Sequence, residues 1–146
     1  MSLANGDGDR DPNRHQPLID AITSFYHALA ESCYIQPSDI HAPPYGPEFN
    51  TSLGLSLGYT PESLELLSKL PYLSEECDNA VQLDGASTTP LIYLTDPSNE
   101  DDWGMWKESR DPLMQGDDAP LLPRNIVAVT WGQVYGQWLL YDLDSC

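Results

Sequence analysis

The sequence has few basic residues. Six Lys and Arg stand against 23 Asp and Glu, which gives a formal net charge of −17 at pH 7. Such a charge repels phosphate groups, and the six basic side chains are scattered along the chain, so we expect no nucleic acid partner and no anionic membrane surface. The sequence also lacks any run of about 18 apolar residues, so we expect no segment that spans a bilayer. A protein with a basic surface is the partner class that this charge favours.

Cysteine is also scarce. Cys33, Cys77 and Cys146 are odd in number and widely spaced, which does not suit a disulfide framework. The first residues lack the basic start and the apolar stretch of a secretory signal peptide. We therefore predict an intracellular, cytoplasmic protein, whose oligomeric state the sequence leaves open.

Apolar residues are sufficient for one modest core. The chain has 146 residues, of which 40% are hydrophobic, and it contains four Trp, eight Tyr and two Phe. This length and composition predict a single globular domain, which we place at residues 17–146. Residues 1–16 hold mainly Gly, Asp, Asn, Arg and Pro, so we expect them to form a disordered tail.

Helical patterns occupy the first half of the chain. Apolar residues between Pro17 and Ile35 recur three or four positions apart, which predicts a helix that begins at Pro17. A short helix is expected from about residue 48 to residue 57. Another helix should follow Thr60, which can cap it, and should end before Pro71.

Strand patterns occupy the second half. A short apolar run at residues 91–95 predicts one strand, and residues 126–131 and 137–143 predict a hairpin around the loop 132–136. The order of helices before strands predicts an α+β fold, with N-terminal helices packed on a small antiparallel sheet that ends in a C-terminal hairpin.

Two tryptophans flank the predicted hairpin loop. Trp131 precedes it and Trp138 follows it. Pairing across the hairpin would make the two indoles neighbours, and such aromatic pairs stabilise sheets. We therefore assign both rings to structure before ligand contact.

Two motifs imitate functional sites, but their surroundings do not fit. Residues Gly54–Gly58 match the G-x-S-x-G elbow of hydrolases, which needs a preceding strand and a later His, whereas every His of this chain lies upstream: His15, His27 and His41. We interpret Gly54–Gly58 as a helix end. Residues 7–11 imitate the start of a calcium loop, but Pro12 stands where that loop needs Gly. We expect no metal, no cofactor and no catalytic residues.

The segment from residue 96 to residue 123 is rich in acids and contains two of the four tryptophans. Large rings in a loop either cover the core or form a recognition surface. The candidate binding residues are Asp101, Asp102, Trp103, Trp106 and Arg110. Arg110 most simply pairs with a neighbouring carboxylate.

Two functions fit these features. The first is a non-catalytic intracellular protein-interaction module, in which an acidic surface centred on residues 96–118 meets a basic partner. A protein that mimics DNA is a special case of it. The alternative is a small-molecule-binding protein or enzyme with a pocket lined by Trp103, Trp106 and Arg110.

Several short phrases occur in an order that resembles a known family: Tyr34-Ile35, Pro43-Pro44, Leu57-Gly58, Leu70-Pro71-Tyr72, Ser109-Arg110-Asp111-Pro112, Leu122-Pro123 and Trp138-Leu139-Leu140-Tyr141-Asp142. From Leu18 to Asp142 the chain resembles a family of small acidic fungal proteins of unassigned activity. Its acidic α+β character and the Gly136-Gln137-Trp138 of the last hairpin also resemble the SMI1/KNR4 (SUKH) proteins. That second resemblance implies an interaction module.

Overall fold

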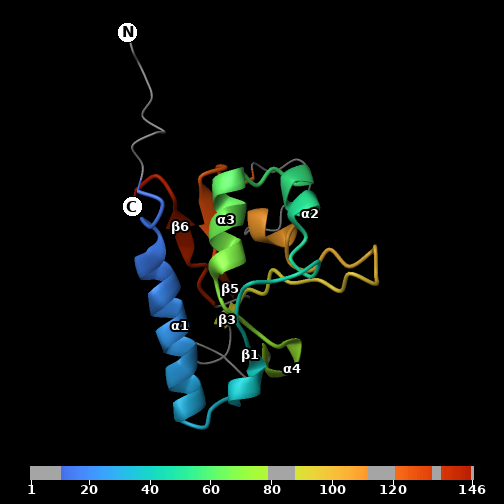
Figure 1. Ribbon diagram of the computed structural model, residues 1–146. Coiled ribbons are helices and arrows are strands. Elements are labelled where there is room, and N and C mark those ends of the chain that lie inside the picture. The colour runs from blue at the N-terminus through green and yellow to red at the C-terminus, as the bar shows by residue number, and fades with distance from the viewer. Residues whose placement is uncertain (1–10, 79–87, 112–120, 133–135, 146) are drawn as a thin grey trace.

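The computed structural model describes residues 11–78, 88–111, 121–132 and 136–145. Helices predominate before residue 80, and the strands that follow pair antiparallel, so the predicted α+β fold is confirmed. Helix α1 runs along one side of the molecule, and the loop that follows β3 projects on the opposite side (Figure 1). None of the helices in the described ranges combines the length and the apolar surface that crossing a membrane requires.

Helix α1 spans Gln16–Glu31, so it ends four residues before the predicted limit. The difference arises at Cys33, whose φ of 59° is left-handed and ends the helix. The amide of Tyr34 then donates to the carbonyl of Leu29 at 2.9 Å, which satisfies one of the last helical carbonyls.

Helices α2 and α3 follow from local signals. In α2 (Thr51–Ser56) the Asn50 side chain accepts a hydrogen bond from a first-turn amide, and in α3 (Pro61–Lys69) Thr60 does the same. Gly58, with a φ of 94°, stands between the two helices. The prediction that Gly54–Gly58 closes a helix is confirmed, because α2 ends within that pentapeptide.

In the part of the chain that the structure describes, the strands form three two-stranded antiparallel ladders. The pairs are β1 (Ile40–His41) with β2 (Tyr72–Leu73), β3 (Thr88–Pro90) with β5 (Thr130–Gly132), and β4 (Ile126–Ala128) with β6 (Leu140–Asp142). The remaining short elements are the 3-10 helices η2 (Pro37–Asp39) and η3 (Glu108–Arg110) and the helix α4 (Glu75–Asp78).

Two details of the predicted strands were wrong. A strand forms just before the expected one, at β3, and residues 91–95 follow it without a ladder in the described residues. Within the described ranges, their amides donate main-chain hydrogen bonds only from Leu91, to Val129, and from Thr95, to Glu48. The expected contact between the indoles of Trp131 and Trp138 is not found among the described residues. Trp131 lies opposite Thr89 of β3, because the chain pairs with β6 before Val129 and with β3 after it. Part of the predicted hairpin loop, residues 133–135, lies outside the described residues.

The core is built around Trp106, which has no exposed surface. The rings of Phe49, Tyr59 and Tyr93 meet it edge-on, with centroids 5.3, 5.0 and 5.0 Å away. Close approach of α2 requires Gly54, because a Cβ there would lie 3.0 Å from the Trp106 ring. This aromatic cluster joins α2, α3 and the strands into one unit.

Candidate functional site

The structure separates the five candidate binding residues that the sequence suggested. Trp106 is completely buried in the core, and Arg110 is 6% exposed. Trp103, three residues before Trp106, is 47% exposed, Asp101 is exposed and Asp102 is half-buried. For Trp106, core cover is therefore the role that the structure shows.

Arg110 lies in an unusual environment. Its Nη2 donates to the carbonyl of Leu122 at 2.6 Å, and its guanidinium carbon lies 5.4 Å from the centre of the Tyr59 ring. Its Nε and Nη1 are buried, and no described residue accepts a hydrogen bond from either. Within the described ranges no carboxylate pairs with Arg110, whose contacts there are a carbonyl and an aromatic face. Residues 112–120, which contain further acids near Arg110 in the sequence, lie outside the described residues.

A groove on the surface, which we call the acidic groove, has a volume of about 810 Å³. Four carboxylates line it, from Glu48, Glu75, Asp96 and Asp102, and the described residues that line it include no Lys or Arg. Its apolar part comes from β1, β2 and the extended segment after β3: Ile40, Leu73, Ile92 and Leu94. The groove therefore combines an apolar surface with an excess of negative charge.

Hydrogen bonds hold the carboxylates of Asp96 and Asp102 and the main chain of Glu48 in the groove. The Thr95 amide donates to the carbonyl of Glu48 at 2.8 Å, which joins two segments that are far apart in the sequence. The Asp102 carboxylate accepts from the amides of Asp96, at 2.6 Å, and Gly104, at 3.0 Å. Hydrogen bonds from the hydroxyl and amide of Ser98 hold the pKa of Asp96 below its usual range, so this acid stays charged at neutral pH.

A second hollow, which we call the apolar pocket, adjoins the acidic groove and has a volume of about 450 Å³. Apart from Glu75 and Thr89, its lining is apolar or glycine: Pro90, Leu91, Ile92, Leu94, Gly104, Met105 and Trp131. Glu75, Ile92 and Leu94 line both hollows, so the two are neighbours on one face.

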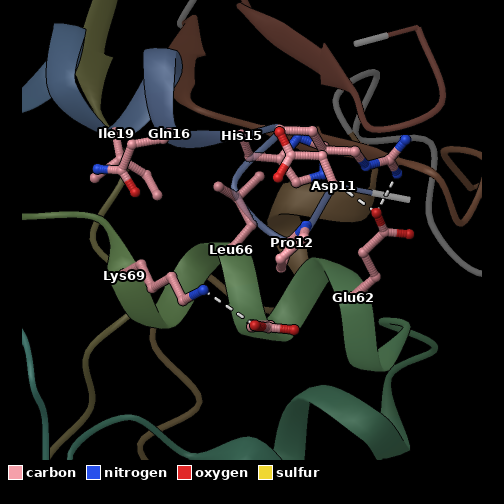
Figure 2. Close-up of a pocket in the computed structure, with 10 residues that line it drawn as sticks. Asp11, Pro12, His15, Gln16, Ile19, Glu62, Leu66 and Lys69 are labelled. Atoms are coloured by element: carbon pink, nitrogen blue, oxygen red, sulfur yellow. Dashed lines mark hydrogen bonds and ion pairs between the residues drawn. The ribbon is translucent and has the colours of Figure 1, made fainter. Parts of the chain in front are cut away.

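A third hollow, of about 420 Å³, lies between the start of α1 and α3 (Figure 2). Figure 2 shows Glu62 of α3 directed toward the chain just before α1, where it binds Arg14 and lies 3.2 Å from Nε2 of His15. Nδ1 of His15 lies 2.8 Å from the hydroxyl of Tyr141 on β6. These side chains bind one another, so their contacts connect the start of α1 to α3 and to β6.

The predicted tail, residues 1–16, includes two residues of this contact, Arg14 and His15. Residues 1–10 lie outside the described residues, whereas Arg14 and His15 are half-buried against Glu62 and Tyr141. Apolar patterning cannot detect these residues, because both are polar and their partners lie more than 40 positions away.

Sequence reasoning named Asp102 and included Asp96 in its acidic surface, but it missed the groove acids Glu48 and Glu75. Each is one of 23 acids in the chain, and no local pattern sets it apart. His41 also lines the groove, as an exposed residue of β1. Across the described ranges, no three His, Cys, Asp or Glu residues are grouped to hold a metal ion. Cys33 and Cys77 are free thiols.

Comparison with known proteins finds no relative: no protein-family model matches, and neither a curated protein nor a solved structure does. The acidic groove and the apolar pocket are therefore the features of this chain that indicate a function.

Proposed function

We propose that this protein is a non-catalytic intracellular interaction module, and that its acidic groove binds a basic segment of a partner protein. One observation carries the proposal: four carboxylates line a single groove whose described lining residues include no cation. The sequence predicted a binding surface centred on residues 96–118. The proposed surface is the groove, which includes Asp96 and Asp102 from that segment and adds Glu48 and Glu75.

The chemistry of the groove suits Lys and Arg side chains. Their charged ends meet carboxylates, and their aliphatic stems pack on apolar surface such as that of Ile92 and Leu94. Long-range attraction should accelerate association, and salt should weaken it, because the Debye length is about 8 Å at physiological ionic strength. A net charge of −17 adds to the attraction for a basic partner and disfavours nucleic acid.

The alternative, a small-molecule pocket lined by Trp103, Trp106 and Arg110, has less support. Trp106 has no exposed surface, and Arg110 is 6% exposed. A ligand would therefore meet only Trp103 of these three side chains without a rearrangement of the core.

The test compares two variants that change the net charge equally. Glu48→Gln with Glu75→Gln removes two charges from the groove, while Asp20→Asn with Glu31→Gln removes two exposed charges from α1, outside it. Binding of a fluorescein-labelled peptide of alternating Lys and Gly is measured by anisotropy at low and at physiological salt. We expect the groove variant to bind about three- to tenfold more weakly than the α1 variant. Equal affinities of the two variants would show that the peptide responds only to net charge.

A further inference from the structure

We infer that one partner segment occupies the acidic groove and the apolar pocket together, so that the partner carries a large apolar side chain close to its Lys or Arg residues. This inference rests on the proposed function and names the class of segment that the same face recognises. It starts from the three residues that line both hollows, Glu75, Ile92 and Leu94.

Ile92 and Leu94 form the boundary between the hollows. Residues 91, 93 and 95 are buried, whereas 92 and 94 are half-buried, which is the alternation of an extended segment with one face in the core. The segment is held at both ends, because the amide of Leu91 donates to Val129 at 3.0 Å and that of Thr95 donates to Glu48 at 2.8 Å. Residues 91–95, which we call the ridge, are therefore ordered before a partner binds. This reduces the loss of conformational entropy on binding.

The apolar pocket has the composition of a site for one large apolar side chain. Met105 and Trp131 stand among its walls, and the flexible thioether of Met adapts to irregular shapes. Its volume of about 450 Å³ falls within the range of roughly 300–1,000 Å³ that ligand pockets have. Glu75 is its only charged lining residue among those described.

The backbone of the ridge favours an extended partner. Within the described ranges, no residue accepts a hydrogen bond from the amide of Ile92 or of Leu94. Along an extended chain these amides point to the side opposite that on which Leu91 and Thr95 are bonded, and we assign the partner backbone to that side. In an extended peptide, side chains two residues apart project from the same face at a spacing of about 6.6–6.8 Å. We therefore assign to the partner an apolar and a basic residue two or four positions apart, which lie on one face of an extended segment.

The experiment uses the full chain and three peptides of equal length. The first contains Phe at two or four positions from a Lys-Gly-Lys segment, the second has Gly in place of Phe, and the third keeps Phe but has Gln in place of Lys. We expect the first peptide to bind at least about tenfold more tightly than the second, because a large apolar side chain is removed from water. Binding of the third should be weaker than that of the second at low salt.

A variant of the apolar pocket tests whether the tighter binding of the Phe peptide comes from that pocket. Met105→Gln makes the pocket wall polar, and it should abolish the advantage of the Phe peptide while leaving the Gly peptide unchanged. The matched control is Leu55→Gln, an exposed apolar residue of α2 that lines neither hollow. Circular dichroism checks that both variants fold.

The outcomes separate the two proposals. Equal binding of the Phe and Gly peptides to the wild-type chain would overturn this inference, while the proposal that the acidic groove binds a basic segment would still hold. Failure of both peptides to bind would overturn the proposed function.

Discussion

The hydroxyl of Tyr59 donates a hydrogen bond of 2.7 Å to the carbonyl of Trp106, while the ring of Tyr59 stands at 88° to the Trp106 indole, 5.0 Å between centroids. One residue therefore contacts both the main chain and the side chain of the centre of the core. This links the start of α3 to the acidic segment that follows residue 96.

We expect Tyr59→Phe to destabilise the protein by about 1–3 kcal/mol, because it leaves the buried Trp106 carbonyl without its donor while the ring contact remains. Urea unfolding followed by tryptophan fluorescence measures this. Tyr34→Phe is the control, since Tyr34 is 57% exposed, and it should unfold at an unchanged urea concentration.

We expect the contribution of Glu62 to stability to depend on pH. Burial alone would raise the pKa of Glu62, but hydrogen bonds and positive charge from Arg14 and His15 outweigh that effect and hold the pKa below its ordinary value of 4.5. The contribution is therefore fully present above pH 4.5 and is lost as the pH falls through the lower pKa of the folded state.

The measurement is the difference in free energy of unfolding between the wild type and Glu62→Gln, taken from pH 7 to pH 3. It should be less than about 1 kcal/mol at pH 7, because the side chain is 37% exposed, and it should decrease at acid pH. A difference that stays constant over this pH range would contradict the assignment. Glu31→Gln, an exposed acid at the end of α1, is the matched control.

We expect Gly54→Ala to destabilise the protein by about 1–3 kcal/mol. A Cβ at this position would lie 2.5 Å from Cδ2 of Leu64 and 3.0 Å from the Trp106 ring, so α2 has to shift. At Gly46 the same change meets only the end of the Glu48 side chain, which can move aside. Thermal unfolding should therefore show a loss for Gly54→Ala that Gly46→Ala does not share.

We expect Thr60→Ala to destabilise the protein by about 1 kcal/mol, because Thr60 caps α3 by accepting a hydrogen bond from the amide of Ser63 at 3.1 Å. Thr60→Ser keeps the accepting oxygen and should retain most of the stability. Equal losses in the two variants, measured by urea unfolding, would show that the methyl group of Thr60 matters more than its cap.

Local signals in the sequence were enough to predict the main helices. The spacing of apolar residues predicted α1, and the Thr60-Pro61 pair predicted the start of α3 to the residue, because capping and helical periodicity involve only neighbours in the chain. Strand positions were less well determined. Residues 91–95 have the composition of a strand, but a ladder also needs a run of backbone bonds to a second strand, and here the bonds among the described residues go to Val129 at one end and Glu48 at the other.

The sequence by itself determined that the protein is acidic, and the order of its helix and strand patterns determined the α+β fold, because both depend on composition or on neighbours in the chain. Only the tertiary structure decided which acids form a groove, because Glu48, Glu75, Asp96 and Asp102 come from separate segments that long-range hydrogen bonds and packing bring together. Only the tertiary structure also decided which of two tryptophans in one acidic loop is buried. Trp103 and Trp106 are chemically identical and three residues apart, but the left-handed turn at Gly104 lies between them, and only Trp106 meets the rings that exclude it from water.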